Sequence, residues 1–168
     1  TIENPDCSNP PKSIVFICKG NICRSPFSHH LAQKKIENDL NAKINIDSAG
    51  LEAKAHERSP ENAISSAADY GLILENHKPK RIGRNMFEGH SMVIAMETWH
   101  FQALKKQFPE STDKIFVLPL FENNEHAKEG GFYRYNIEDP YGKSIDEFHK
   151  CFRRVEGVLR GCLMKLRK

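Results

Sequence analysis

The sequence predicts an α/β protein, a single doubly wound domain in which helices flank a four-stranded parallel sheet. Short apolar runs of strand length alternate along the chain with longer segments of helical periodicity, which is typical of parallel βαβ units. The first apolar run ends in a cysteine, and a polar loop and a helix start follow it. Ligands bind at such places, beyond the carboxyl ends of parallel strands.

The strands are predicted from apolar runs that polar or glycine-containing stretches bound. Ile14–Cys18 is nearly continuous in apolar residues, as expected of a strand that is covered on both faces. Three further strands are expected at 44–48, 91–96 and 115–118. Residues 50–58 and 122–138 are expected to be loops. Residues 1–12 are expected to be a tail before a domain of residues 13–168.

The helices are predicted from their start and stop signals. Ser25-Pro26 supplies a helix start, Gly71 is expected to cap a helix, and Pro109 stops another. The last helix has acidic residues in its first turn and basic residues at its end, which suits the helix macrodipole. The four helices are expected at about 25–40, 59–71, 98–108 and 144–166.

The composition is that of an ordinary globular domain. Of the 168 residues, 39% are apolar and 28% are charged, and a net charge of +3 argues against nucleic acid as a partner. No apolar stretch approaches the roughly 20 residues that span a membrane, and the polar start has no signal-peptide pattern. Five unevenly spaced cysteines do not form a secreted disulfide framework, so we expect a cytoplasmic protein.

Residues 18–26, Cys-Lys-Gly-Asn-Ile-Cys-Arg-Ser-Pro, combine a thiol, a short loop and an arginine. An arginine and the start of a helix both favour the thiolate of Cys18, which is the nucleophilic form. Arg24 can hold two phosphate oxygens in its planar fork, which a lysine cannot do. Ser25 can donate a hydrogen bond to the thiolate. The combination predicts a site for phosphoryl transfer.

The loop between the thiol and the helix can bind an anion with its backbone. Gly20 permits a backbone conformation or a close approach that a β-carbon would block, and Asn21 tolerates the left-handed conformation. A lone cysteine after a strand is more often a buried small residue, and a zinc site would need two further ligands. The whole string favours a phosphate nest. Its amides are those of Lys19, Gly20, Asn21, Ile22, Cys23 and Arg24.

The same string resembles the signature loop of the low-molecular-weight protein tyrosine phosphatases. The resemblance covers the chain from about Lys12 to Leu166 and continues in the family's order at Asp47-Ser-Ala-Gly50, His77, Met96 and Asp139-Pro-Tyr141. It implies the flavodoxin-like strand order 2-1-3-4. It further implies that Cys18 attacks phosphorus to form a cysteinyl-phosphate and that Arg24 clamps the phosphate. Asp139, held on a stiff turn by the following proline, would be the general acid and then the general base.

The resemblance also implies supporting residues. Asn21, Ser48 and His77, with Ser25, match a network that shapes the loop. The oxidisable thiolate has Cys23 close enough along the loop to form a reversible disulfide, so Cys23 is the expected redox partner. No metal or other cofactor is implied, because the arginine and the loop amides neutralise the phosphate.

The substrate pocket departs from the family pattern. Ile22 and Tyr141 match its walls, but Lys54 stands where many members carry an aromatic residue. This lysine could favour acidic flanks on a substrate. Glu97 replaces the usual aspartate after the third-strand methionine. Three histidines match no family role and are expected at the surface: His29, His30 and His100.

The expected partner is a phosphotyrosine-containing protein substrate, and the expected acting unit is a monomer. A related branch hydrolyses phosphoarginine and resembles this chain, but a threonine tends to stand where Ile22 is. An apolar branched residue narrows the slot and suits a flat aryl ring, so phosphotyrosine is favoured. Arsenate reductase is disfavoured because no relay cysteine lies between Cys23 and Cys151. A non-catalytic phosphopeptide-binding module would lack a nucleophile or an acid, and both are present.

Overall fold

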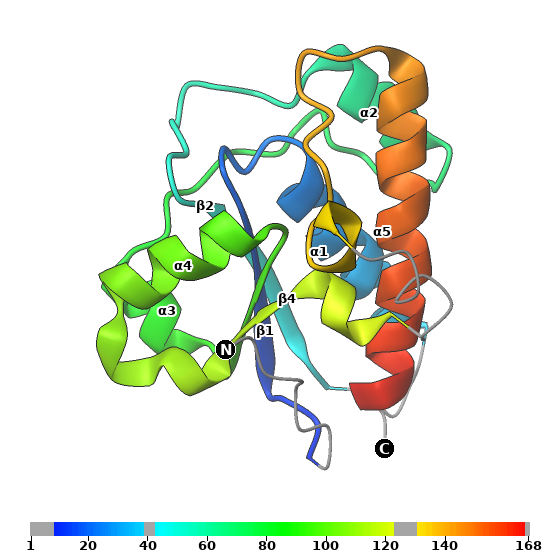
Figure 1. The fold of residues 1–168 in the computed structure, drawn as a ribbon. Helices are drawn as coiled ribbons and strands as arrows, with labels where there is room; N and C mark the ends of the chain where they lie inside the picture. The colour runs from blue at the N-terminus through cyan, green and yellow to red at the C-terminus, as the bar shows by residue number, and fades with distance from the viewer. Residues whose placement is uncertain (1–8, 39–42, 123–130, 167–168) are drawn as a thin grey trace.

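The sheet has four parallel strands with the first strand inside it (Figure 1). The computed structural model describes residues 9–38, 43–122 and 131–166. The strands are β1 (Ser13–Cys18), β2 (Asn45–Gly50), β3 (Met92–Ala95) and β4 (Ile115–Val117). Their order is β2-β1-β3-β4, which confirms the predicted topology.

Helices cover both faces of this sheet (Figure 1). Helices α1, α2 and α5 pack on one face, and α3 and α4 pack on the other. The α-helices are α1 (Arg24–Glu37), α2 (Glu61–Ala68), α3 (Arg84–Gly89), α4 (Thr98–Gln107) and α5 (Ile145–Leu166). The 3₁₀ turns are η1 (Pro109–Lys114), η2 (Leu118–Phe121) and η3 (Phe132–Arg134).

The side chains of β1 alternate between two cores. Ile14, Phe16 and Cys18 belong to the core under α1, α2 and α5, whereas Val15 and Ile17 belong to the core under α3 and α4. Every residue of the strand is buried, which explains why the run is almost continuously apolar. The alternation places the last residue of β1 on the face of α1, the helix that begins directly after the loop.

The longest helix, α5, runs beside α1 and α2. Asp146 and Glu147 stand in its first turn and Lys165 in its last, as predicted from the macrodipole. Within the part of the chain that the structure describes, no helix has the combination of length and apolar sequence that a membrane crossing needs.

The structure adds elements that the sequence pattern did not predict. The short helix α3 lies between α2 and β3, and its buried Phe87 stacks on Phe108 with ring centroids 4.1 Å apart. A helix of six residues is too short for a helical period to show in the sequence. The turn η3 lies within the expected loop 122–138, of which residues 123–130 fall outside the described residues.

The helix ends also differ slightly from the prediction. Helix α1 begins one residue earlier than expected, and its expected end at Leu40 lies outside the described residues, as does most of the tail 1–12. Helix α2 ends at Ala68. The expected cap, Gly71, has φ +69° and donates its N–H to the Ala68 carbonyl at 2.9 Å. Fraying and capping geometry decide such boundaries.

The carboxyl ends of three neighbouring strands meet at one edge of the sheet. Cys18 pairs with Gly50 of β2, and Ile17 pairs with Ala95 of β3. The residues that follow these three strands therefore converge on the same place. This edge is the ligand-binding position of open parallel sheets.

Candidate active site

The loop from Cys18 to Arg24 connects β1 to α1 and lies directly against the end of β2. Asn21 takes φ +56°, the left-handed conformation that the sequence predicted. Gly50 permits the close approach of the loop, because a β-carbon there would lie 2.6 Å from the Lys19 carbonyl oxygen and 2.9 Å from the Asn21 nitrogen. Such distances would force the backbone to move.

Gly20 makes no close contact with the rest of the described protein that a β-carbon would block. The φ angle of Gly20 is not positive, and a β-carbon there would lie 3.4 Å from the Ile22 side chain, which is an ordinary contact. The position that has no room for a β-carbon is Gly50, at the end of the neighbouring strand β2. The sequence showed Gly50 only through the family resemblance, since a close approach between two segments leaves no local pattern.

The sulfur of Cys18 has polar neighbours from both the loop and the helix. The Asn21 N–H donates to Sγ at 3.3 Å, and the Ser25 hydroxyl oxygen lies 3.0 Å from Sγ. A thiolate carries no hydrogen, so Ser25 is the donor whenever Cys18 is ionised. Donors that point at a buried sulfur stabilise its charged form.

The Asn21 side chain joins the loop to its support. Its Nδ2 donates to Ser25 Oγ at 2.8 Å and to Ser48 Oγ at 3.0 Å, and its Oδ1 accepts the Lys80 N–H at 2.9 Å. His77 Nε2 lies 2.8 Å from the Asn21 carbonyl oxygen. Burial lowers the pKa of His77, and the neutral ring donates to this carbonyl. The structure therefore brings together the network residues that the sequence predicted.

The Arg24 side chain is only 1% exposed and is held by three oxygens. Its Nη1 donates to Glu97 Oε2 at 2.6 Å and to the Ile137 carbonyl at 2.8 Å, and its Nη2 lies 3.0 Å from Asp139 Oδ2. Burial by itself would lower the pKa of Arg24, but the charges of Cys18, Asp139 and Glu97 outweigh burial and raise it. The guanidinium stays charged and its plane is fixed.

Two residues without a predicted role, Glu97 and His100, support this arginine. The expected surface position of His100 is wrong, because its ring is completely buried. Its Nδ1 accepts the Glu97 N–H at 3.0 Å in a capping box at the start of α4. Trp99 Nε1 donates at 3.2 Å to the Glu97 oxygen that binds Arg24. Burial lowers the pKa of His100 to about 2, so the ring is neutral.

A sequence signal for Glu97 existed. Glu97 lies two residues after the end of β3, and side chains that follow parallel strands converge on the ligand edge of the sheet. The rule gives the location of Glu97. It does not give its partner, which depends on where the Arg24 side chain runs.

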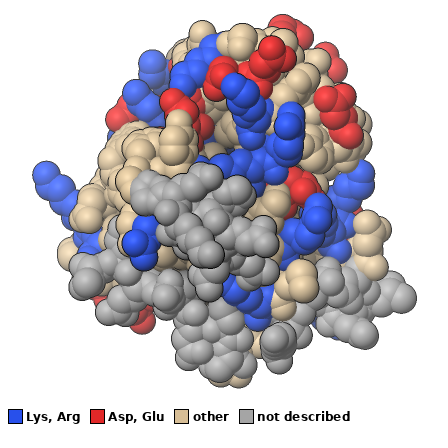
Figure 2. Space-filling view, turned by 45° about the vertical axis from the view of Figure 1, so that its right-hand side comes forward, with Lys and Arg blue, Asp and Glu red and all other residues tan. Residues whose placement is uncertain are grey.

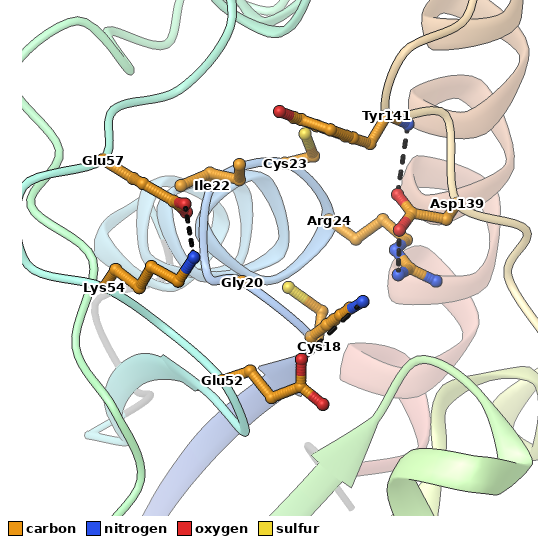
Figure 3. A pocket seen from close by; sticks show the side chains of 11 residues that line it. Cys18, Gly20, Ile22, Cys23, Arg24, Glu52, Lys54, Glu57, Asp139 and Tyr141 are labelled. Carbon is orange, nitrogen blue, oxygen red and sulfur yellow. Dashed lines mark hydrogen bonds and ion pairs between the residues drawn. The ribbon is translucent and has the colours of Figure 1, made fainter.

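Cys18 and Arg24 line a pocket of about 270 Å³ (Figure 3). Tyr141 and Asp139 stand on one side of this pocket, and Lys54 stands on the opposite side beside Glu57 (Figure 3). The Tyr141 N–H donates to Asp139 Oδ1 at 3.2 Å, which holds the carboxylate on its turn. The predicted nucleophile, clamp and acid therefore share one pocket.

The mouth of the pocket carries loose ion pairs. Lys54 Nζ lies 3.8 Å from Glu57 Oε1, and Lys19 Nζ lies 3.7 Å from Glu52 Oε2. Acidic and basic side chains also lie side by side in the upper part of the view in Figure 2. Exposed pairs of this kind contribute little stability and rearrange easily. The mouth can therefore adapt to a substrate in a way that the buried loop cannot.

The second loop cysteine, Cys23, lines the same pocket as Cys18 and is buried. Burial, and then the charge of Cys18, raises the pKa of Cys23 far above its ordinary value. Cys23 is therefore a protonated thiol at neutral pH.

Comparison with known proteins agrees with this geometry. The family model of low molecular weight phosphotyrosine protein phosphatases matches residues 13–168. The chain belongs to this family. Members are phosphomonoester hydrolases, so the predicted enzyme class is confirmed.

Relatives of this phosphatase differ in their named substrates. The tyrosine phosphatase Wzb of Escherichia coli is 30% identical over 148 residues, which cover 88% of this chain and 90% of the relative. A protein-arginine-phosphatase of Bacillus subtilis is 30% identical over 156 residues, which cover 92% and 97%. The solved structure of Escherichia coli Wzb with sulphate has a TM-score of 0.78 at 26% identity and covers 93% and 99%.

Proposed function

We propose that this phosphatase hydrolyses phosphotyrosine in protein substrates through a cysteinyl-phosphate intermediate. The observation that carries the proposal is the convergence of Cys18, Arg24 and Asp139 on one pocket. A nucleophile, an anion clamp and a proton donor are the groups that a phosphate monoester needs. The named activity of the Escherichia coli relative supports the same conclusion.

In the first step the Cys18 thiolate attacks phosphorus, and an S–P bond forms while the bond from phosphorus to the phenolic oxygen breaks. Protonated Asp139 gives its proton to that leaving oxygen. Arg24 and the amides of residues 19–24 hold the three equatorial oxygens, so catalysis depends on positioning and electrostatic stabilisation. Nη2 of Arg24 lies 3.0 Å from Asp139 Oδ2, so the clamp and the acid are close enough to act on one phosphate ester.

In the second step a water molecule attacks the phosphorus of the intermediate. The Asp139 carboxylate removes a proton from this water, the S–P bond breaks, and inorganic phosphate leaves. The step restores the Cys18 thiolate and the protonated acid.

The choice between phosphotyrosine and phosphoarginine is tested with matched peptides that carry either group at one position. Ile22 and Tyr141 present apolar surface to an aryl ring, so kcat/KM is expected to be at least about tenfold higher for phosphotyrosine, or about 1.4 kcal/mol. Faster hydrolysis of the phosphoarginine peptide would assign the chain to the activity named for the Bacillus subtilis relative. Cys18→Ser is expected to release no phosphate from either peptide.

We further propose that Cys23 protects the nucleophile from irreversible oxidation. Peroxide converts the Cys18 thiolate to a sulfenic acid and is itself reduced to hydroxide. The Cys23 thiol then forms a disulfide with loss of water. Both residues are free thiols in the described chain. Peroxide inactivation that dithiothreitol reverses in the parent, and fails to reverse in Cys23→Ser, is the expected result.

We also propose that the enzyme acts in the cytoplasm as a monomer. The free thiols of the pocket need a reducing compartment. A sedimentation-equilibrium mass of one chain in solution is the expected measurement.

A further inference from the structure

His29, on the second turn of α1, faces the support of the loop rather than solvent. The expected surface position is wrong for this residue, because its side chain is only 15% exposed. Its Nδ1 lies 3.2 Å from Ser48 Oγ, and its ring stacks on His30 with centroids 4.6 Å apart. His30 is partly buried as well. Neither His29 nor His30 takes part in the mechanism proposed above.

The hydrogen bonds of Ser48 determine what His29 does. Asn21 Nδ2 donates to Ser48 Oγ at 3.0 Å, so the Ser48 hydroxyl hydrogen needs an acceptor of its own. Nδ1 of His29 is in place to accept it. Burial, and then His30, lowers the pKa of His29 to about 4, so the ring is neutral near pH 7.

The opposite tautomer, with the hydrogen on Nδ1, fits less well. Asp47 Oδ1 lies 4.0 Å from Nδ1, which is beyond hydrogen-bond distance. That oxygen already accepts from Lys80 Nζ at 2.6 Å and from the Ser48 N–H at 2.8 Å. With Nδ1 as a donor, Ser48 Oγ would receive two hydrogens and its own would be left without an acceptor.

The same network ends on the nucleophile. Asn21 Nδ2 donates to Ser25 Oγ at 2.8 Å, so the Ser25 hydrogen must point elsewhere. Cys18 Sγ at 3.0 Å is nearer than the Ala49 carbonyl at 3.3 Å. Without the His29 acceptor the Ser48 hydroxyl could rotate, so its lone pairs would lose their fixed direction toward the Asn21 amide, and this amide would be held less firmly against the Ser25 hydroxyl. The hydroxyl would then have no fixed direction toward the sulfur.

We propose that His29 is a positioning residue for the nucleophile, since its Nδ1 accepts the Ser48 hydroxyl hydrogen and so keeps the Asn21 amide directed at Ser25. The inference rests on the proposed use of Cys18 as nucleophile. It extends the predicted network by a half-buried imidazole on α1. It also names the donor and the acceptor in each hydrogen bond of the chain that runs from His29 through Ser48, Asn21 and Ser25 to Cys18.

The test measures how fast iodoacetamide alkylates Cys18 as a function of pH, with the Cys18 peptide quantified by mass spectrometry. In His29→Ala the Ser25 bond to the thiolate is loosened. Loss of one hydrogen bond of about 1 kcal/mol corresponds to about fivefold slower alkylation at pH values below the midpoint. The midpoint is expected to move to higher pH, and kcat is expected to fall more than KM changes.

Two variants separate positioning from packing. In His29→Asn, the amide oxygen can take the place of Nδ1 as acceptor, and alkylation is expected to return to within about twofold of the parent rate. His56→Ala removes an exposed imidazole and is expected to change nothing. In the double variant His29→Ala/Ser48→Ala, the loss is expected to equal the larger single loss, because both residues act through one bond.

The outcomes are distinct from those of the proposed function. Parent-like alkylation of Cys18 in folded His29→Ala would overturn the inference, and so would a loss that His29→Asn fails to restore. The alkylation rate is measured without any phosphorylated substrate, so it does not depend on whether the protein hydrolyses one. If Cys18→Ser still released phosphate, the covalent mechanism would fail while the alkylation result stood.

Discussion

The floor and the rim of the pocket are built in different ways. We define the floor as Cys18, Asn21, Arg24, Ser25 and Ser48, and the rim as Lys19, Glu52, Lys54, Glu57 and Tyr141. Every floor residue is buried, and hydrogen bonds of 2.6–3.3 Å link these residues to one another and to Glu97. Among the described residues, the buried Nε of Arg24 has no hydrogen-bond partner. The ion pairs of the rim span 3.7–3.8 Å, and Tyr141 is 62% exposed.

This difference separates two tasks. Buried polar groups that hydrogen bonds hold in place have few alternative arrangements, which suits stabilisation of a fixed transition-state charge. Exposed pairs cost little to break, so the rim can change its contacts with each substrate. Substitutions in the floor are therefore expected to reduce the rate for every substrate. Substitutions in the rim are expected to change the ranking of substrates.

The largest effect is expected from Arg24→Lys. A lysine keeps the charge but loses the planar fork that holds Glu97, Ile137 and the phosphate at once. Removing one preorganised donor of this kind lowers kcat by about 10²–10³-fold. Arg84→Lys is the matched control, because Arg84 is an exposed arginine that pairs with Glu88 and does not line the pocket. Its kcat is expected to stay within about twofold of the parent value. A loss smaller than tenfold in Arg24→Lys would show that the floor tolerates rearrangement.

A smaller effect is expected from Gly50→Ala. The added methyl group would lie 2.6 Å from the Lys19 carbonyl oxygen, so the loop must shift away from β2. Overpacking of this kind costs about 1–3 kcal/mol of unfolding free energy, measured by urea denaturation. Activity is expected to fall as well, because the loop carries the phosphate-binding amides. Gly89→Ala, where nothing lies within 4 Å of the added carbon, is the control and should leave both unchanged.

Much of the fold could be predicted because the apolar sequence of β1 by itself identifies a buried strand. A strand that is buried on both faces is apolar throughout, and the helices that follow it have clear start signals. Helix α3 could not be predicted, because six residues with one buried side chain produce no period. The order of strands and helices could be predicted because short apolar runs alternate with segments of helical periodicity. The exact helix ends could not, because they depend on capping geometry that the local sequence specifies weakly.

The site was predictable where function depends on a contiguous string. Cys18, Arg24 and the amides between them lie in one loop, and Asp139 is marked by the proline after it. Glu97 and His100 were missed because their roles arise from the packing of α4 against Arg24. His29 was missed for the same reason, since a helical histidine reads as a surface residue until β2 is placed beside it.

The buried His100 and the half-buried His29 predict a pH dependence of stability. His29 has its pKa lowered to about 4 and His100 to about 2, mainly by burial. In the unfolded chain both take up protons near pH 6.5. The unfolded state therefore binds more protons below this pH, and the free energy of unfolding is expected to fall between about pH 6.5 and 4.

The measurement is urea unfolding at several pH values in the parent and in single variants. His29→Asn and His100→Asn each remove one buried titrating group, so each is expected to flatten the slope of stability against pH. His56→Asn changes an exposed ring and should keep the parent slope. Equal slopes of unfolding free energy against pH in the parent and the three variants would show that the folded protein does not keep these two rings neutral.

The smallest effect is expected at the rim, from Lys54→Met. The substitution removes a cation from the pocket wall and frees the Glu57 carboxylate, which lies 3.8 Å from Lys54 Nζ. A free carboxylate attracts the guanidinium of phosphoarginine, whereas the lysine repels it. The ratio of kcat/KM for phosphoarginine to that for phosphotyrosine should rise by no more than about fivefold, since an exposed pair is worth up to about 1 kcal/mol.

Lys19→Met is the matched control, because it breaks an ion pair of nearly the same length, with Glu52, at a different point of the rim. The ratio of kcat/KM for phosphoarginine to that for phosphotyrosine should change less in Lys19→Met than in Lys54→Met if the two sides of the mouth contact different parts of the substrate. A more than tenfold fall of kcat for both substrates in Lys54→Met would contradict the division of tasks. Such a fall would mean that the rim holds the transition state as the floor does. A change confined to the ratio would show that an exposed lysine can select substrates while the buried loop performs the same chemistry on each.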